Sequence, residues 1–361
     1  MTGVNLFRGS GWRRPKLNVG GDPKTTTLTL GWLAGGHRER EDWLLQIVST
    51  SSDVRISIVV PHLGDNAGFE ESLVSVLENR PAGSEVCVVH DGSYQDPFDL
   101  GDEVRFIRAE SSRLPRLIAA AAEATSSRAI HILGNGIRAT SGWTEVPLRR
   151  LSGENCALVA PLLVDQIERT AAAGWVESAQ RVYAPMLADP KELSPSDLTV
   201  VRGVYLAASF WRRSELLAVS RAAAFDDWSA CEFAWSRLLV DSGWSCEATE
   251  DSIVIGEPHQ LVPRGSFEGG RWLRSLATEF SGESQIAGAV RASVANVLRP
   301  IGLFRTGGLA QVAGQLASVV ARPAGIARLR RAAIEAPKPE GMTLPATLRI
   351  DAYPAGIRRC A

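Results

Sequence analysis

The chain has 361 residues, of which 45% are hydrophobic and 22% are charged, and its formal net charge is −1. This length fits one large domain or two, and the composition is that of an ordinary soluble globular protein with a large core. The balanced charge provides no field that would attract a nucleic acid, so we expect no nucleic-acid partner.

The five cysteines include no C-x-x-C pair, which argues against a zinc ribbon or a thioredoxin-like site, and their odd number argues against a disulfide framework. Cys87 and Cys156 lie inside apolar runs, where buried and reduced thiols are expected. Residues 1–14 lack the apolar core of a signal peptide, and no apolar run is long enough to cross a membrane. We therefore expect a cytoplasmic protein.

The first regular pattern follows a glycine-rich stretch, residues 1–52, which we predict to be an N-terminal extension. Ile56–Val60 is a β-branched run ended by Pro61, which is typical of a buried parallel strand. The next apolar residues recur at i, i+4, i+7 and i+8, as on one face of a helix: Phe69, Leu73, Val76 and Leu77. A second strand, Glu85–Val89, completes a βαβ unit.

Strands and helices continue to alternate along the chain, although residues 162–230 are mixed. Further strands are predicted at Val104–Ile107, Ala129–Leu133, Ala157–Ala160 (closed by Pro161), Val200–Phe210 and Ile253–Ile255. Further helices are predicted at Leu114–Ala124, from near Ser214, and at Cys231–Val240, which looks amphipathic and is ended by Gly243. The alternation predicts an α/β fold with an open, mostly parallel sheet and flanking helices, spanning 53–262.

The composition changes after residue 262. Gly265, Gly269 and Gly270 are predicted to form a linker. Helices then follow in a region spanning 263–335, at Arg271–Phe280, Gln285–Leu298, Gly308–Val320 and Ala324–Ile334, and a proline-rich, poorly ordered tail spans 336–361. Two interpretations of the late arginines (Arg322, Arg328, Arg330 and Arg331) stay open. They belong either to a helix in peripheral contact with the inner face of the membrane or, the favoured interpretation, to a packed helix with its arginines in water.

Ligands of such sheets bind beyond the carboxyl ends of the strands. Here those ends are Pro61-His62, His90-Asp91 and Gly134-Asn135-Gly136. Three sequence landmarks occur in order around them: Val60-Pro61, Ser75-Val76-Leu77 and Val89-His90-Asp91-Gly92-Ser93. Over roughly 53–260, this ordered set resembles the family 2 glycosyltransferases.

The resemblance implies a GT-A (Rossmann-like) fold, a nucleotide-sugar donor and a sugar or lipid-linked acceptor. Asp91 stands where the family has an acid that contacts the base or ribose, and a carboxylate can accept hydrogen bonds from both. The alternative is that Asp91-Gly92 simply forms a turn. The implied nucleotide-binding residues are Pro61, His62, His90, Asp91, Gly92, Arg116, Gly134, Asn135 and Gly136.

The chain departs from the family at its metal-binding Asp-x-Asp motif. The strand that should precede it runs into Gly134-Asn135-Gly136, which offers no carboxylate to Mn²⁺ or Mg²⁺. We therefore assign no metal ligand and no cofactor. Backbone N–H groups of the glycines, or the guanidinium groups of Arg113, Arg116 or Arg138, could replace the charge of the cation beside a diphosphate.

The family's catalytic base lies near an acidic pair at a helix start, about ten residues before Gly-Trp. Cys231-Glu232 precedes Gly243-Trp244 at that spacing, so Glu232 is a candidate for the base that takes a proton from the acceptor hydroxyl. Asp226 and Asp227 replace it if the alignment shifts. The alternative role for such an acid is to stabilise a helix N-terminus.

The histidines give weaker signals. His259 lies near the place of a family histidine, and His131 in mid-strand is expected to be structural. A zinc site of His62, His90 and Asp91 is a minor alternative.

The resemblance, together with the missing Asp-x-Asp motif, implies a nucleotide-sugar-dependent glycosyltransferase that is metal-independent or impaired. The main rival is a catalytically inactive GT-A-like protein used for binding or as a scaffold. A different nucleotide-binding α/β protein is disfavoured, because no G-x-G-x-x-G or P-loop motif opens a helix.

Overall fold

The computed structural model describes residues 54–179, 181–282, 284–298 and 307–326, which all lie in one structural unit. The extension predicted for 1–52 and the tail predicted for 336–361 lie outside the described residues. The division into four regions stays a prediction.

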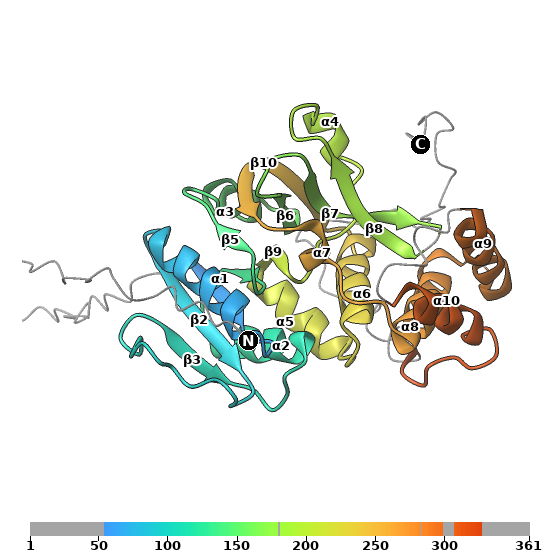
Figure 1. Cartoon of the computed structure of the whole chain (residues 1–361), viewed down its shortest axis with the longest axis horizontal. Coiled ribbons are helices and arrows are strands. Elements are labelled where there is room, and N and C mark those ends of the chain that lie inside the picture. Colours follow the sequence, from blue (N-terminus) through green and yellow to red (C-terminus); the bar gives the residue numbers. More distant parts are fainter. Residues whose placement is uncertain (1–53, 180, 283, 299–306, 327–361) are drawn as a thin grey trace, which may run out of the picture. The chain divides into compact units, whose positions relative to one another are not determined.

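Ten strands and ten helices make up the described part of the chain (Figure 1). The strands are β1 Ile56–Pro61, β2 Ser84–His90, β3 Arg105–Arg108, β4 Ala129–Leu133, β5 Arg138–Ala139, β6 Cys156–Val164, β7 Ala171–Ser178, β8 Val182–Ala188, β9 Ala208–Arg212 and β10 Ser245–Ile255. The helices are α1 Asn66–Glu78, α2 Leu114–Ala124, α3 Glu145–Leu151, α4 Pro195–Leu198, α5 Arg213–Ala222, α6 Trp228–Asp241, α7 Pro258–Leu261, α8 Phe267–Ser281, α9 Gln285–Leu298 and α10 Gly308–Ala317.

The strands form one sheet in the order β3-β2-β1-β4-β9-β6-β10-β5, and the hairpin β7–β8 extends from β6. Pairing is parallel from β3 to β4 and between β6 and β10. Every residue of β1, β4 and β6 is buried, which explains their unbroken apolar runs, because a strand covered on both faces has no polar side. The predicted fold class, an open and mostly parallel α/β sheet with flanking helices, is confirmed.

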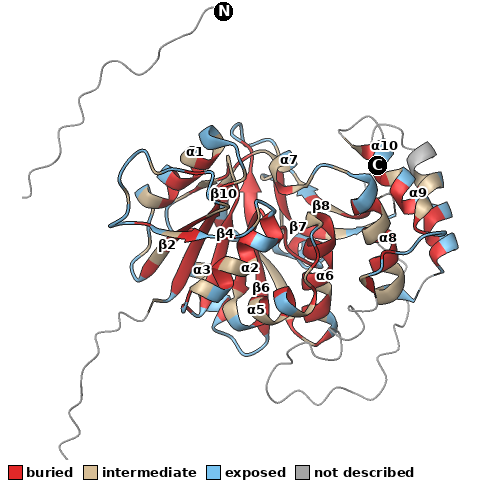
Figure 2. Cartoon of the chain, turned by 90° about the horizontal axis from the view of Figure 1, so that it is seen from below, coloured by how far each residue is buried: buried red, intermediate tan, exposed pale blue. Residues whose placement is uncertain are grey.

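Helices cover the central strands on both faces. Figure 2 shows α1 on one side of the buried strands and α2 and α5 on the other. Helices α2, α5 and α6 also pack against one another, and α6 contacts α8. The apolar face predicted for the first helix is confirmed, since Phe69, Leu73 and Val76 are buried in α1.

One central strand runs against its neighbours. β9 pairs antiparallel with both β4 and β6, and it begins only at Ala208, although a strand was predicted over Val200–Phe210. The direction of β9 was not predicted, because strand direction depends on the path of the chain between strands rather than on the residues of the strand itself.

The strand predicted to end at Pro161 instead continues through it to Val164. Proline has no N–H group for the sheet, so it is normally excluded from central strands. Here β6 pairs with β9 at Leu158 and Val159 and with β7 from Leu162 onward. On this side of β6, Pro161 falls in the gap between the two partners, and on the other side it pairs with Thr249 of β10, next to a register shift.

Helix α6 begins at Trp228, three residues earlier than predicted, and the prediction that it is amphipathic is wrong. Ten of its residues are buried, because the sheet, α5 and α8 surround it. A helix covered on all sides has no exposed polar face.

The predicted glycine linker is also wrong in part, because Gly269 and Gly270 lie inside α8. A Cβ atom on Gly270 would lie 2.0 Å from the carbonyl oxygen of Gln311. On Gly314 of α10 it would lie 1.9 Å from the carbonyl oxygen of Phe267. These glycines therefore allow the backbones of α8 and α10 to touch, which larger residues would prevent.

The C-terminal arginines are described only in part. Arg322 donates to Gln285 at 2.6 Å and pairs with Glu279 at 3.2 Å, so this side chain is held against α8 and α9. Arg328, Arg330 and Arg331 lie outside the described residues. No helix in the described ranges is long and apolar enough to cross a membrane.

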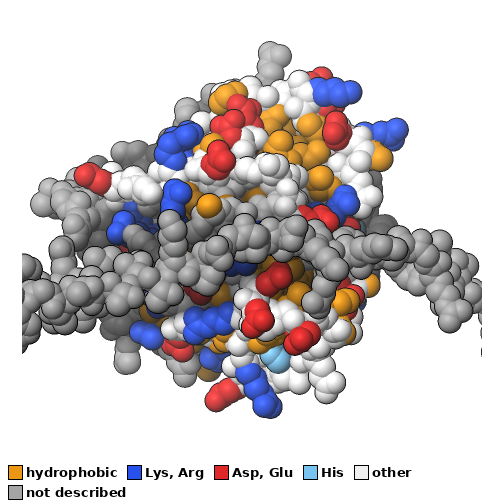
Figure 3. Space-filling view, turned by 90° about the vertical axis from the view of Figure 1, so that its left-hand side faces the viewer, with side chains coloured by type: hydrophobic (Ala, Val, Ile, Leu, Met, Phe, Trp, Pro, Cys, Tyr) orange, Lys and Arg blue, Asp and Glu red, His pale blue; other side chains and the backbone are white. Residues whose placement is uncertain are grey.

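Two further expectations can be compared with the structure. Cys87 and Cys156 are buried free thiols, as predicted. On the face shown in Figure 3, acidic and basic side chains are interspersed over the visible described residues, in keeping with the balanced net charge.

Candidate functional site

The carboxyl ends of β1, β2 and β4 lie along one edge of the sheet because these strands are parallel neighbours. Pro61 is buried at the end of β1, and the backbone N–H of His62 continues the pairing by donating to Val89 at 2.8 Å. The buried His62 ring has its Nε2 2.7 Å from the Asn66 Oδ1 and packs edge-on against Phe69. Its Nδ1 is buried and has no hydrogen-bond partner among the described residues.

A tight turn follows β2. Asp91 accepts a hydrogen bond from the Ser93 N–H at 3.0 Å, and hydrogen bonds from Ser93 hold the pKa of Asp91 below its usual value. Gly92 has a φ of +100°, and a Cβ there would approach Arg108. Burial, and then the charge of His62, lower the pKa of His90. Asp91 and Gly92 therefore lie in a bend, with the Asp91 side chain partly exposed, and the role of Asp91 in nucleotide binding stays a prediction.

The glycines after β4 serve close packing. The N–H groups of Gly134 and Gly136 donate to the carbonyl oxygens of Ala207 and Gly68, both at 2.7 Å. A Cβ on Gly134 would lie 3.2 Å from Ala207, and on Gly136 it would lie 2.3 Å from the Gln260 side chain. These two N–H groups are thus engaged within the protein. The Asn135 Oδ1 is buried without a partner among the described residues.

The residues at this edge do not fit a divalent cation. Gly134 and Gly136 have no ligating side chain, and the Asn135 amide donates to the Asp65 carbonyl oxygen at 3.3 Å. Within the described ranges, no three His, Cys, Asp or Glu side chains gather where they could hold a metal ion. The alternative zinc site of His62, His90 and Asp91 is therefore not assembled.

Glu232 is fully buried inside α6. Its Oε1 accepts a hydrogen bond from the Tyr183 hydroxyl at 2.6 Å, and its Oε2 accepts from the Leu206 N–H at 2.8 Å and from the Trp228 indole at 3.2 Å. Burial raises the pKa of Glu232 to about 8. The carboxyl group thus links β8, the segment before β9 and the start of α6 through hydrogen bonds. It is not exposed to a sugar acceptor in solution.

The raised pKa of Glu232 predicts a pH-dependent stability. A carboxyl group that binds its proton more tightly when folded stabilises the fold at low pH, and this stability is lost as the pH rises from about 4.5 to about 8. We expect the free energy of unfolding to fall between about pH 5 and pH 8, and since histidines titrate near pH 6.5 in both proteins, the comparison with Glu232→Gln isolates the contribution of this carboxyl group. Denaturant melts of the wild type and Glu232→Gln should show this slope in the wild type only, and equal slopes would contradict the assignment.

The acidic pair at the start of α6 is Asp226-Asp227, not Cys231-Glu232. Asp227 is the N-cap of the helix, and its Oδ1 accepts from the Ala230 N–H at 2.9 Å. Burial raises the pKa of Asp227, although its bonds to backbone N–H groups act in the opposite direction.

A cavity of about 710 Å³ lies at the starts of α2 and α6, beside the residue that follows His62. It is lined by Leu63, Ser112, Arg113, Leu114, Pro115, Arg116, Ala224, Phe225, Asp226, Asp227, Trp228, Glu268 and Trp272. Of the residues that the sequence analysis named as candidates, Arg113, Arg116, Asp226 and Asp227 line it. Those that do not line it include Pro61, His62, His90, Asp91, Gly92, Gly134, Asn135, Gly136 and Glu232.

Two arginines and two aspartates face each other in this cavity. Arg116 pairs with Asp226 at 3.0 Å, and Arg113 lies 3.8 Å from the same carboxylate. About half of each of these side chains is exposed, so the pairs are weak and exchangeable. The sequence indicated Arg113 and Arg116 as possible partners of a diphosphate, but it did not indicate that they meet Asp226.

Trp228 and Trp272 were missed entirely. The indole of Trp228 lines the cavity while its N–H donates to buried Glu232, and Trp272 of α8 packs on Phe225 with ring centroids 4.7 Å apart. The only sequence signal was the position of Trp228 directly after two acids. Trp272 belongs to a region that we had predicted to be separate.

Comparisons with known proteins give structural likenesses only. No protein-family model matches the sequence, and no curated protein matches it. Among solved structures, the chain is similar to GalNAc-T7 with UDP, GalNAc and Mn²⁺, at 13% identity and a TM-score of 0.48, covering 62% of this chain and 48% of that one. It is also similar to the mannosyltransferase PcManGT from Pyrobaculum calidifontis in complex with GDP-Man and Mn²⁺, at 13% identity and a TM-score of 0.43, covering 78% and 86%. The chain thus spans about half the length of the first of these proteins.

Proposed function

We propose that this chain is a glycosyltransferase of the family 2 type that moves a sugar from a nucleotide donor to an acceptor hydroxyl. The observation that carries the proposal is the cavity at the carboxyl edge of the sheet, where Arg113 and Arg116 meet Asp226 and Asp227. Ligands of open α/β sheets bind at this edge. A site for this reaction needs cations for a diphosphate and a carboxylate for a proton, and this cavity has both.

In this proposal, Asp227 is the catalytic base. Its carboxylate lines the cavity, and burial raises its pKa, which favours proton uptake. The acceptor oxygen attacks the anomeric carbon as its proton passes to Asp227, and the bond from that carbon to the diphosphate breaks. The leaving diphosphate takes the bonding electrons, and the two arginines stabilise its charge.

Arg113 and Arg116 are available for this role because their present partner is exposed. The Asp226 side chain is about half exposed to solvent while it pairs with both guanidinium groups. A diphosphate carries more charge and more acceptor oxygens than one carboxylate, so it can displace Asp226. Asp91, at the same edge but outside the cavity lining, is proposed to contact the nucleoside part of the donor.

Glu232 is proposed to be a positioning residue rather than the base. It holds the indole N–H of Trp228, whose ring lines the cavity. No step is assigned to a divalent cation, because the residues after β4 do not fit one.

The proposal is tested by calorimetric titration of the full chain with UDP, GDP and their sugar conjugates, with and without Mn²⁺. We expect at least one of them to bind, with an affinity that Mn²⁺ leaves unchanged. Arg116→Ala should weaken this binding by about tenfold, the loss of one charge-assisted hydrogen bond.

Arg221→Ala is the matched control, because Arg221 also pairs on the surface with one carboxylate, Glu123 at 3.1 Å, but does not line the cavity. It should leave the affinity unchanged. Absence of binding under every condition, or an equal loss in both variants, would contradict the proposal.

The second candidate is a GT-A-like protein that binds or organises partners without catalysis. It is favoured by one observation: the N–H groups of Gly134 and Gly136 are engaged within the protein, where a diphosphate would need donors. Nucleotide binding without turnover of any sugar conjugate would favour this candidate. Peripheral contact with a membrane and a sugar or lipid-linked acceptor remain part of the first proposal.

A further inference from the structure

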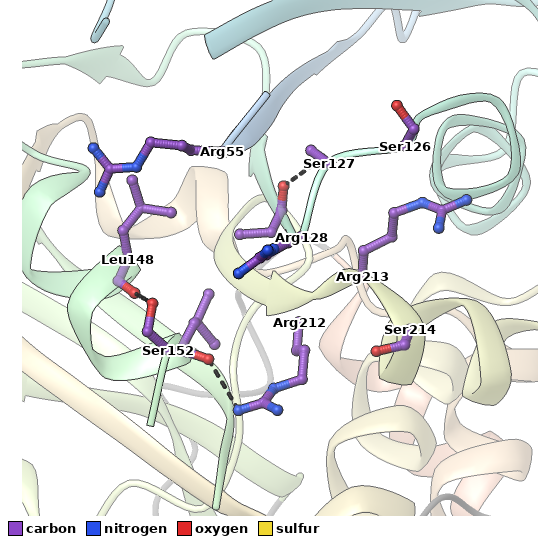
Figure 4. A pocket seen from close by; sticks show the side chains of 11 residues that line it. Arg55, Ser126, Ser127, Arg128, Leu148, Ser152, Arg212, Arg213 and Ser214 are labelled. Atoms are coloured by element: carbon purple, nitrogen blue, oxygen red, sulfur yellow. Dashed lines mark hydrogen bonds between the residues drawn. The ribbon is translucent and has the colours of Figure 1, made fainter. Parts of the chain in front are cut away.

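We propose a second ligand site at the opposite edge of the sheet, which binds a small organic molecule carrying phosphate groups. A cavity of about 630 Å³ lies there, at the amino ends of β1 and β4 and the carboxyl end of β9 (Figure 4). Its lining contains four arginines: Arg55, Arg128, Arg212 and Arg213. This site is independent of the proposed transfer reaction.

Strand register explains why these arginines gather. Ile56 of β1 pairs with Ala129 of β4, so the residues before them, Arg55 and Arg128, are also neighbours. Because β9 is antiparallel, its end reaches this edge, and the Arg213 N–H donates to the Arg128 carbonyl oxygen at 3.0 Å. Figure 4 shows Arg55, Arg128 and Arg213 in this order across the view.

Arg212 completes the cluster from a fixed position. It pairs in register with Ala129, and its guanidinium group lies 4.9 Å from the centre of the Trp244 ring. Its terminal nitrogen donates to the carbonyl oxygens of Leu151, at 2.9 Å, and Gly153. Its Nε is buried and has no partner among the described residues, so one donor remains unsatisfied.

The described lining of this cavity is rich in positive charge. No Asp or Glu is among its described lining residues. The ion pairs of the described ranges include none for Arg55, Arg212 or Arg213. Like charges side by side on neighbouring strands destabilise a sheet. A bound anion would remove this repulsion, because guanidinium groups bind phosphate oxygens through paired hydrogen bonds.

The remaining lining residues favour an organic phosphate over a bare ion. Helix α5 begins at Arg213 without a side-chain cap, so its N-terminus adds positive potential to the arginine cluster. Four serines, Ser126, Ser127, Ser152 and Ser214, supply hydroxyl groups, and Leu148 and Leu151 form an apolar wall. Glu215 is a nearby carboxylate, but it bonds to the Ser214 hydroxyl and does not line the cavity. A volume of this size accommodates a small molecule.

The two cavities lie at opposite ends of the same strands. β1 runs from Ile56, next to Arg55, to Pro61, and the first cavity begins at Leu63. A strand rises about 3.3 Å per residue, so the two ends of β1 are about 20 Å apart. Occupancy of one site can therefore be changed by mutation without altering the other.

The test uses pyrophosphate and UDP as probes, titrated calorimetrically into the full chain carrying Arg116→Ala, which weakens binding in the first cavity by about tenfold so that the two sites are resolved. We expect at least one probe to bind, and Arg55→Glu to weaken its binding by tenfold or more. The Arg55 side chain has no hydrogen bond or ion pair among the described residues, so this variant should unfold at the same denaturant concentration. The double change Arg55→Gln and Arg213→Gln should weaken binding further.

Arg105→Glu is the matched control. Arg105 is also half-exposed and lies at the start of a strand, but it pairs with Glu85 and lies outside the cavity lining. Its change should leave probe binding unaltered. Absence of probe binding, or equal affinity in Arg55→Glu, would overturn the second site, whereas the outcome of the transferase test does not affect this result.

Discussion

Asp227→Asn is expected to lower the rate of sugar transfer by about 10²–10⁴-fold, the usual contribution of a positioned general base. Asparagine has the same shape but cannot take the acceptor proton. It also caps a helix as well as aspartate does, so the bond to the Ala230 N–H and the start of α6 should persist. The rate is measured as release of UDP or GDP from whichever sugar conjugate binds.

The affinity for the donor should change little in this variant, because Asp227 acts on the acceptor. Asp197→Asn is the matched control: Asp197 also belongs to a capped helix start, that of α4, but lies away from the cavity. Undiminished turnover in Asp227→Asn would remove Asp227 from the catalytic role. Loss of turnover in Glu232→Gln alone would instead restore Glu232 as the base.

Glu232→Ala is expected to lower the free energy of unfolding by about 3–5 kcal/mol. The change removes the acceptor of two buried donors, the Tyr183 hydroxyl and the Leu206 N–H, and of one partly buried donor, the Trp228 indole N–H. Each unsatisfied buried donor costs about 1–3 kcal/mol, and removal of a side chain of this size also leaves a cavity. Denaturant unfolding monitored by tryptophan fluorescence measures the loss.

Two controls make this result specific. Glu232→Gln keeps an acceptor oxygen and should cost much less than the alanine change, on the order of 1 kcal/mol. Glu123→Ala removes a surface carboxylate paired with Arg221 and should cost less than about 1 kcal/mol. A small loss in Glu232→Ala would show that these buried bonds do not stabilise the junction of β8, β9 and α6.

Local sequence patterns predicted the first half of the sheet well. The runs Ile56–Val60, Glu85–Val89 and Ala129–Leu133 are strands, and their ends lie at one edge of the sheet, as expected. His131 is a buried structural residue, with its ring stacked on Phe210 and its Nδ1 3.0 Å from the Ser209 carbonyl oxygen. These features follow from the side-chain period and from the apolar runs of buried strands, which are local properties.

The second half depended on contacts that are distant in sequence. Spacing to Gly243 favoured Glu232, but burial against Tyr183 and Leu206 takes this residue away from the cavity. Arg116 and Asp226 are 110 residues apart and meet only because α2 and α6 start side by side. Neither contact produces a periodic pattern of residues in the sequence from which it could be predicted.

The sequence by itself determined the fold class, the positions of the first strands and the absence of carboxylates after β4. Only the tertiary structure decided which acid lines the cavity, where α6 starts and why an arginine cluster gathers at the far edge. Periodicity and motifs record how a segment meets its immediate neighbours. Strand direction and helix packing, which bring Arg213 to Arg55 and Asp226 to Arg116, are set by the whole chain.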